Sequence, residues 1–294
     1  MIDRLEMFVV LAQERHFGRA AERIGITQPT LSSALKALEG NLGVQLVHRG
    51  SRFQGLTAEG ERVYARALSL VADARALKDE MRAVRGGLTG DLRLGVIPTA
   101  LPMVADLTGP FSARHPELRF QIVSRTSAEI LDQVDDNLID AGITYLDGAT
   151  GRRQVVPLYS ERYCLLVARG DRRARLATIG WAEVGGLPLC LLTRDMQNRR
   201  IVDGHLARAG VAPLPMVESN SNVALLAHVL TGRWFSVVPA KLAKLLGATA
   251  GVASVPIEGG GSEPVGLVVA PRAPHTPAVA ALIALAQAMA KGGK

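Results

Sequence analysis

The stretch that decides the fold is 16-HFGRAAERIGITQPTLSSALKALE-39. Its apolar residues recur at helical spacing in two sets, separated by a turn signal at Gly25–Thr27. The first set is Phe17, Ala20, Ala21 and Ile24, and the second is Leu31, Leu35 and Leu38. The pattern predicts two short helices that bury these faces against each other, with Ile26 filling the turn between them.

The second helix carries short polar side chains on its opposite face, which are Gln28, Thr30, Ser32, Ser33 and Lys36. This layout is typical of a helix-turn-helix, whose second helix lies in the major groove of DNA. We expect Gln28 to read adenine through its amide, and the three hydroxyls to make single contacts with bases or phosphates. The stretch therefore predicts sequence-specific binding to double-stranded DNA.

The order of segments along the chain resembles that of the LysR-type transcriptional regulators. AAERIGITQPTLSSALKALE (residues 20–39) is followed by LGVQLVHRGSRFQGLTAEG (residues 42–60), a long helix and an α/β remainder. Val47 stands where these proteins usually carry an aromatic residue, a difference that concerns packing beneath the wing. The resemblance covers essentially the whole chain. It implies an α/β protein with an N-terminal winged helix-turn-helix, a long dimerisation helix and a two-lobed, periplasmic-binding-protein-like effector domain.

The segments on either side of the helix-turn-helix complete a DNA-binding head, expected at residues 1–58. A helix from about Asp3 to Glu14 has one buried apolar stripe. Residues 42–57 are expected to form a two-stranded wing that turns at Gly50 and Ser51. Arg49 and Arg52 flank that turn, where they would reach phosphates or a minor groove, unless they are solvated surface arginines.

A heptad pattern marks the next segment, residues 59–87, as one long helix. Its narrow apolar seam consists of Val63, Ala67, Leu70, Ala74, Leu77, Met81 and Val84. Such a seam favours pairing with the same helix of a second copy, so we expect a homodimer. The alternative is that the helix packs on its own C-terminal domain. The tetramer is implied only by the family resemblance.

From residue 88 onward, short β-rich runs alternate with helical runs, which predicts βα units on mainly parallel sheets. The expected strands are Leu92–Ile97, Arg119–Val123, Ala141–Tyr145, Tyr163–Val167, Leu189–Leu192, Phe235–Val238 and Val265–Val269. The expected helices are Ala100–His115, Ser127–Asp136, Arg199–Ala209, Asn222–Leu230 and Pro277–Ala290. The effector domain, 88–294, would then have one lobe at about 91–165 and 267–294, and a second at about 166–266.

Ligands of such domains bind where strands end and helices begin. The residues expected to bind the effector are Thr99, Thr126, Ser127, Thr193, Arg194, Gln197 and Asn222. Hydroxyls and helix N-termini, with Arg125, Arg199 and Arg200 nearby, favour a small anion such as a carboxylate. For each residue taken singly, helix capping is the common alternative.

Composition supports a globular, cytoplasmic protein. Of 294 residues, 48% are hydrophobic and 21% are charged, so disorder is unexpected. Residues 1–90 hold 13 Lys/Arg against 10 Asp/Glu, and the remainder holds 21 against 17, so the net charge of +7 is not concentrated in the head. Cys164 and Cys190 lie in apolar runs and are expected to be buried thiols rather than a redox pair. We expect no signal peptide and no membrane span.

Enzymes and solute-binding proteins are the alternatives to a regulator. The sequence contains no dinucleotide-binding or Walker glycine motif, no Gly-x-Ser-x-Gly and no clustered metal ligands, so we predict no catalytic residues and no bound metal. The expectation of no leader and the helix-turn-helix both argue against a solute-binding protein. We therefore expect no cofactor beyond a small-molecule co-inducer, and no membrane partner.

Overall fold

The computed structural model describes residues 1–48, 53–248, 251–271 and 275–292. The chain divides into two compact units, Met1–Gly87 and Leu88–Lys294. Arg49 and Arg52, and the turn expected between them at Gly50 and Ser51, lie outside the described residues.

Three helices form the core of the first unit, and they confirm the predicted helix-turn-helix. They are α1 (Ile2–Glu14), α2 (Phe17–Ile24) and α3 (Gln28–Leu42). Gly25 ends α2 with a φ of 75°, a left-handed conformation that glycine adopts without strain. Thr27 then starts α3, since its side chain accepts a hydrogen bond from the backbone N–H of Thr30. The predicted apolar face of α3 is buried, at Leu31, Leu35 and Leu38.

The wing is less regular than expected in the residues that the structure describes. It is represented by one isolated antiparallel bridge between Val47 and Leu56. At Gly60 the chain comes back close to the start of the wing. A Cβ atom at this position would lie 2.0 Å from the carbonyl oxygen of Leu46. Glycine is therefore required at this position, because any side chain would push the wing away from the following helix.

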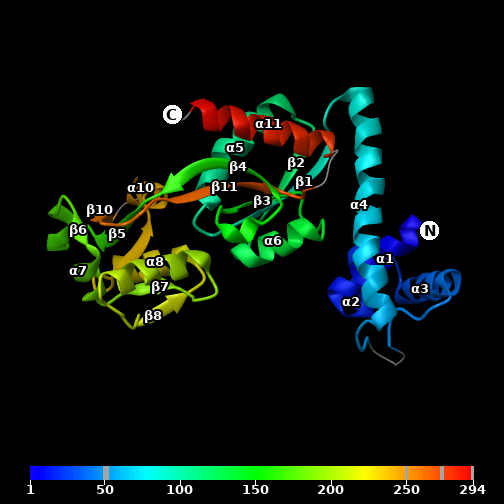
Figure 1. Cartoon of the computed structure of the whole chain (residues 1–294), viewed down its shortest axis with the longest axis horizontal. Helices are drawn as coiled ribbons and strands as arrows, with labels where there is room; N and C mark the ends of the chain where they lie inside the picture. The colour runs from blue at the N-terminus through cyan, green and yellow to red at the C-terminus, as the bar shows by residue number, and fades with distance from the viewer. Residues whose placement is uncertain (49–52, 249–250, 272–274, 293–294) are drawn as a thin grey trace. The chain divides into compact units, whose positions relative to one another are not determined.

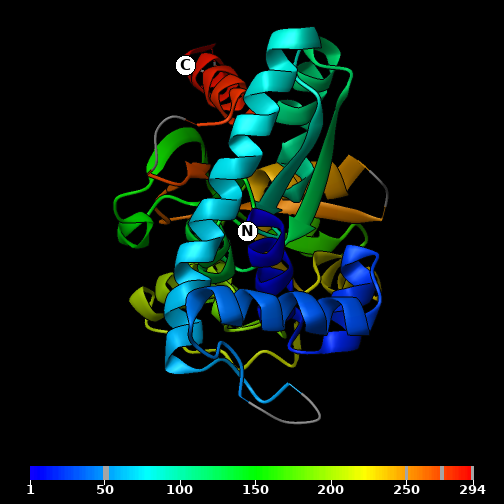
Figure 2. The same cartoon turned by 90° about the vertical axis from the view of Figure 1, so that its right-hand side faces the viewer.

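The long helix α4 (Ala58–Gly86) follows, and Figure 2 shows α3 running across its axis. Its first half packs on the head, where Ala67, Leu68 and Val71 are buried. Its second half leaves large apolar side chains uncovered in the single chain: Leu77 is 59% exposed and Met81 is 53% exposed. The predicted seam therefore has two parts. Ala67 packs inside the head, whereas Leu77 and Met81 form an apolar stripe that the single chain leaves uncovered.

The first lobe of the second unit is a five-stranded sheet in the order β2-β1-β3-β11-β4. Its strands are β1 (Gly90–Val96), β2 (Leu118–Ser124), β3 (Ala141–Tyr145), β4 (Gln154–Glu161) and β11 (Glu263–Val269). Helices α5 (Leu101–Arg114) and α11 (Pro277–Gly292) cover one face, and α6 (Ser127–Asp135) covers the other, as Figure 1 shows.

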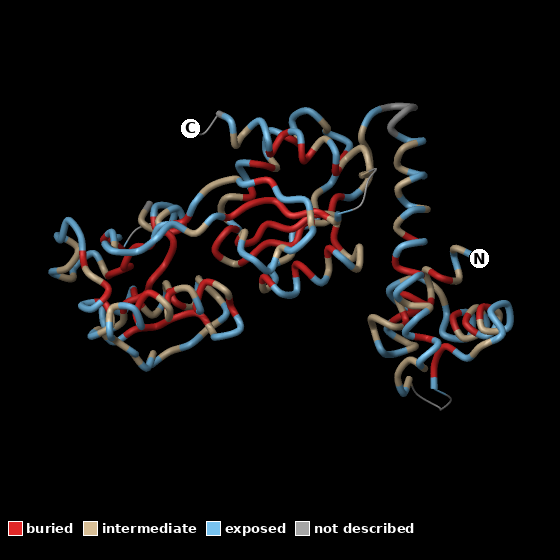
Figure 3. The backbone as a smooth tube through the Cα atoms, viewed as in Figure 1, coloured by how far each residue is buried: buried red, intermediate tan, exposed pale blue. Residues whose placement is uncertain are grey.

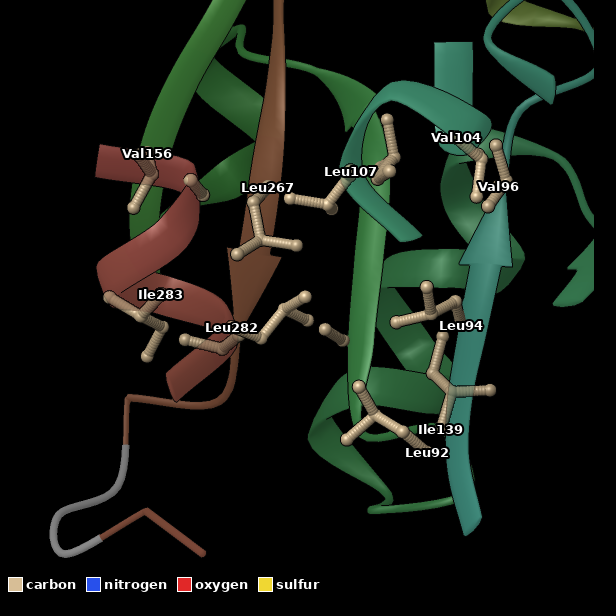
Figure 4. Packing of buried hydrophobic residues seen from close by; sticks show 14 of the residues in the cluster. Leu92, Leu94, Val96, Val104, Leu107, Ile139, Val156, Leu267, Leu282 and Ile283 are labelled. Carbon is tan, nitrogen blue, oxygen red and sulfur yellow. The ribbon is translucent and has the colours of Figure 1, made fainter. Parts of the chain in front are cut away.

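The core of this lobe lies between the sheet and its helices. Alternate residues of a strand share one face, and β1 accordingly directs Leu92, Leu94 and Val96 into the apolar cluster shown in Figure 4. Figure 3 shows that burial concentrates along the central strands. From the covering helices, the same cluster takes Val104, Leu107, Phe111, Leu282 and Ile283.

The second lobe has a four-stranded sheet in the order β6-β10-β5-β9, with a parallel β7-β8 pair beside it. Its strands are β5 (Tyr163–Ala168), β6 (Ile179–Gly180), β7 (Cys190–Leu192), β8 (Val217–Ser219), β9 (Ser236–Pro239) and β10 (Val252–Glu258). Its helices are α7 (Trp181–Gly185), α8 (Gln197–Arg208), α9 (Asn222–Leu230) and α10 (Ala240–Ala248). Short 3₁₀ turns lie at Gly148–Thr150 and Arg172–Arg175.

The expectation of mainly parallel sheets was wrong for the strands at the crossovers. β11 runs antiparallel to both β3 and β4, and β5 runs antiparallel to both β9 and β10. These strands enter and leave the lobes in opposite directions, because the chain crosses over at residue 162 and returns at residues 259–262. Both crossings precede the boundaries expected at 166 and 266 by a few residues.

Candidate functional site

The outer face of α3 is the first candidate site. Gln28, Thr30, Ser33 and Lys36 are exposed, and Ser32 is half-buried. The hydroxyl of Thr30 lies 2.8 Å from that of Thr27, so it also supports the start of the helix. Among the described residues, no hydrogen bond occupies the side chains of Gln28, Ser33 or Lys36, which leaves these three groups available to an external partner.

A small pocket open to solvent is the second candidate site; its empty space is about 210 Å³ when the adjoining open solvent is included. It lies where β1, β3 and β7 end and where α6 and α8 begin. Its lining consists of Ile97, Pro98, Thr99, Thr126, Ser127, Tyr145, Leu192, Met196, Gln197 and Asn198. Of the seven residues expected to bind an effector, the structure brings Thr99, Thr126, Ser127 and Gln197 together here.

A buried hydrogen-bond network forms one wall of the cavity. The phenol oxygen of Tyr145 accepts from the amide of Asn198 at 3.0 Å and lies 3.5 Å from the hydroxyl of Thr99. Its hydrogen is donated to the carboxylate of Glu161 at 2.6 Å. Glu161 is only 2% exposed, and this burial raises its pKa to about 7.

The first lobe also contributes the start of α6. Thr126 caps this helix in a reciprocal capping box with Glu129, so its hydroxyl is already engaged. Ser127 follows it and is 8% exposed, and its hydroxyl has no hydrogen-bond partner among the described residues. A buried hydroxyl without a partner is costly unless a ligand or water satisfies it.

The start of α8 faces the cavity from the second lobe. Its N-cap residue, Met196, provides no capping hydrogen bond from its side chain. Gln197 donates to the carboxylate of Asp147 at 3.0 Å and thereby ties α8 to the first lobe. The free N–H groups of a helix start attract anions, and this cavity has two such starts on its lining.

Three expected effector residues do not line the cavity. Asn222 instead donates to the carbonyl oxygen of Pro98 at 3.1 Å, which makes it a tie between the lobes. Thr193 is half-buried, and its hydroxyl has no partner in the part of the chain that the structure describes; Arg194 is exposed. Arg194 and Thr193 precede the turn into α8, and the cavity begins only at Met196.

The arginines near the cavity do not supply its positive charge. Arg199 is 1% exposed, and its guanidinium donates to the carbonyl of Leu192 and to the carboxylates of Asp203 and Glu218. Its charge is therefore already balanced. Arg125 and Arg200 are exposed, and neither lines the cavity. The anion-attracting groups at this site are hydroxyls and helix starts.

Sequence reasoning missed three members of the site, Tyr145, Asn198 and Glu161. Tyr145 lies at the end of an expected strand, the position from which ligands are usually contacted, so this signal was present. Asn198 adjoins Gln197 at a helix start. Glu161 is the last residue of β4, a strand that the apolar pattern did not predict, and the pairing of β4 with β11 is what places it beside Tyr145.

Comparison with known proteins covers both units of the chain. Residues 2–61 match the bacterial regulatory helix-turn-helix proteins of the lysR family, and residues 85–291 match the LysR substrate binding domain. IlvR, a transcriptional regulator of Caulobacter vibrioides, is 31% identical over 83% of this chain and 84% of its own. A probable hydrogen peroxide-inducible genes activator of Mycobacterium leprae is 31% identical over 71% of each chain.

Solved structures agree in fold. A full-length OxyR variant from Pseudomonas aeruginosa is 26% identical, with a TM-score of 0.76, and the match covers 98% of this chain and 94% of that one. CbnR complexed with its target DNA is 22% identical, with a TM-score of 0.69, and the match covers 98% and 99%. No helix within the described residues is long and apolar enough to cross a membrane.

These matches cover the helix-turn-helix and the two-lobed domain in one chain. The family is one of transcriptional regulators rather than of enzymes, and its members act on DNA, as multimers, under the control of small molecules. This protein belongs to the LysR family and is a DNA-binding transcriptional regulator with an effector-binding domain.

Proposed function

We propose that this regulator binds operator DNA through α3 and that a small carboxylate in the cavity between its two lobes controls the binding. Gln28 reads adenine, and Ser32, Ser33 and Thr30 make single contacts, with Lys36 on the backbone phosphates. Gln28, Ser33 and Lys36 are exposed, and among the described residues none of their side chains makes a hydrogen bond, which supports the assignment. As a DNA-binding protein, it would act in the cytoplasm.

We propose that the uncovered stripe of α4 pairs with the same stripe of a second copy. Leu70, Leu77 and Met81 lie on it, and each is about half exposed or more in the single chain. Burying large apolar side chains contributes about 1.5–3 kcal/mol each. The pairing also supplies the second recognition helix that two operator half-sites need. Assembly of two dimers into a tetramer extends this proposal by family likeness.

One observation supports a carboxylate as the ligand: two helix starts and a buried hydroxyl without a partner line the same small cavity. Ser127 supplies the buried hydroxyl, and α6 and α8 supply the free N–H groups. A carboxylate has two oxygens that accept hydrogen bonds from such donors. Because these donors come from both lobes, an anion that bridges them binds the closed arrangement more tightly than the open one. Anion binding therefore shifts the protein toward the closed arrangement, and this shift changes its affinity for DNA.

A peroxide signal acting on a thiol is the alternative that the relatives raise, since several are hydrogen peroxide-inducible genes activators. The sequence has two cysteines, and both are buried in the second lobe without a disulfide. Burial raises the pKa of Cys164, and it raises that of Cys190 to about 11. A reactive thiol needs a lowered pKa and access, and neither cysteine lines the cavity.

A gel shift on the protein's own upstream DNA, with and without small carboxylates, tests this proposal. We expect a salt-dependent shift that acetate or a slightly larger monocarboxylate alters at millimolar concentration, whereas hydrogen peroxide leaves it unchanged. Ser127→Ala should remove the carboxylate effect and keep the shift, with Ser124→Ala as a matched surface control. A shift that answers to peroxide but to no carboxylate would contradict the assignment.

A further inference from the structure

Glu161 is a buried carboxyl group at the crossover from the first lobe to the second. It is 2% exposed and accepts hydrogen bonds from the phenols of Tyr145 at 2.6 Å and Tyr159 at 3.3 Å. Among the ion pairs of the described residues, none includes Glu161. A carboxylate that is buried without a cation destabilises its surroundings unless it holds a proton.

The charged groups around Glu161 do not neutralise it. The ammonium of Lys241 (α10) lies 3.9 Å from the ring centre of Tyr159. Its charge lowers the pKa of Glu161, but the effect of burial is larger. Glu263 stands opposite Glu161 on β11 and adds a like charge, and His205 (α8) lies 3.9 Å from Glu263. The remaining titratable groups that act on this cluster are Tyr163 on β5 and Asp106 on α5.

The single hydrogen of the Tyr145 phenol links Glu161 to the cavity. While Glu161 is ionised, the phenol donates this hydrogen to the carboxylate. Toward Asn198 and Thr99, the phenol oxygen can then only accept hydrogen bonds. When Glu161 carries a proton, it donates to the phenol oxygen instead. The phenol hydrogen is then free to turn toward Thr99 and the cavity. Protonation therefore changes this wall from an acceptor into a donor.

We propose that Glu161 couples the binding of a carboxylate in the cavity to the uptake of one proton, with Tyr145 as the relay. This inference rests on the carboxylate pocket proposed above. One proton moves from solvent to Glu161 as one anion enters, so the charge of the site stays at minus one. No covalent bond forms or breaks apart from the new O–H bond of the glutamic acid. Glu161 acts as a positioning residue, because Tyr145 rather than Glu161 lines the cavity.

The pKa of Glu161 places this coupling in the neutral range. Because burial raises it to about 7, the carboxyl is mostly protonated at pH 6 and mostly ionised at pH 8. If only the protonated form binds the anion, the Kd should rise close to tenfold for each pH unit above about 7 and level off below it. A carboxylate such as acetate stays ionised throughout this range, so the change belongs to the protein.

Calorimetric titration of the full chain with acetate and propionate, between pH 6 and pH 8, tests the coupling. In buffers of different ionisation enthalpy, the wild type should take up close to one proton per anion at pH 8 and almost none at pH 6. Glu161→Gln carries a permanent donor toward Tyr145, so its Kd should stay near the wild-type pH 6 value throughout. Glu263→Gln is the matched control: it removes a neighbouring charge, and it should keep the pH dependence with its midpoint lowered.

The outcomes separate this inference from the proposed function. Equal Kd values at pH 6 and pH 8, with no proton uptake, would overturn the coupling and leave the carboxylate pocket standing. Failure of every small monocarboxylate to bind at pH 6 would overturn the pocket and the coupling together, while DNA binding is decided by gel shift. Infrared spectra of the ligand-free protein provide a second readout. A protonated-carboxyl band that is lost in Glu161→Gln should titrate near pH 7, and a midpoint near pH 4.5 would refute the inference.

Discussion

Replacing Glu161 with Gln should change how the stability of the effector domain depends on pH. Burial raises the pKa of this carboxyl from 4.5 to about 7, a difference of about 2.5 units. Each unit corresponds to about 1.36 kcal/mol, so the ionised form costs the folded state about 3 kcal/mol. The folded state holds the proton more tightly, so stability from this group is full below about pH 4.5. It is lost as the pH rises to about 7.

Urea unfolding of the wild type and Glu161→Gln, at several pH values, measures this effect. Both tryptophans, Trp181 and Trp234, lie in the second lobe, so their fluorescence follows the effector domain without interference from the head. We expect the stability of the variant relative to the wild type to rise by on the order of 2–3 kcal/mol from about pH 5 to about pH 8. A constant contribution from the glutamine amide does not affect this slope.

Taking the difference between the two proteins removes the other titrating groups. His205 and His275 both have pKa values lowered by burial, so they add stability as the pH rises and oppose Glu161 in the wild type. They do so equally in the variant. A free-energy difference that stays flat from about pH 5 to about pH 8 would show that Glu161 ionises normally, and would refute the reasoning from burial.

Four further substitutions test the remaining assignments. Leu77→Lys should leave the head folded and turn the dimer into monomers in sedimentation velocity runs, and an unchanged dimer would place the interface elsewhere. Thr27→Ala should lower the stability of the head by about 1 kcal/mol, measured by calorimetry, because α3 loses its N-cap. Ser33→Ala should weaken operator binding by about 1 kcal/mol in a gel shift without altering stability. Thr99→Val should keep DNA affinity and abolish the carboxylate response, so a normal response would move the pocket.

The head could be predicted from sequence because its signals are local. Gly25 and Thr27 encode a helix stop and a helix start within three residues, and the leucines of α3 repeat at the helical period. The wing was harder to predict, because one bridge between Val47 and Leu56 depends on the closeness of Leu46 to Gly60. That closeness is set by backbone packing, which apolar periodicity does not encode.

The effector domain was predicted well where strands are buried on both faces and poorly at the crossovers. β3 is buried at every position, and its bounds match the expected Ala141–Tyr145. β4 and β10 have only a few buried residues, without regular alternation, and contain prolines, Pro157 and Pro256. Their pattern is therefore weak, although they carry the chain between the lobes. The same holds for the site: Thr99 and Ser127 were predicted because they follow recognisable strands, and Glu161 was missed because its strand has no clear pattern.

The misplaced arginines show why residue type alone could not settle the chemistry of the cavity. Arg199 has the charge that a carboxylate requires, yet it is balanced by Asp203 and Glu218. Glu161 has the opposite charge, yet its burial beside Tyr145 makes it a proton carrier at neutral pH. An anion site built from neutral donors attracts its ligand weakly, and a buried carboxylate nearby weakens it further. Protonation of Glu161 removes that repulsion and adds a donor, so the affinity of the cavity should follow the proton concentration.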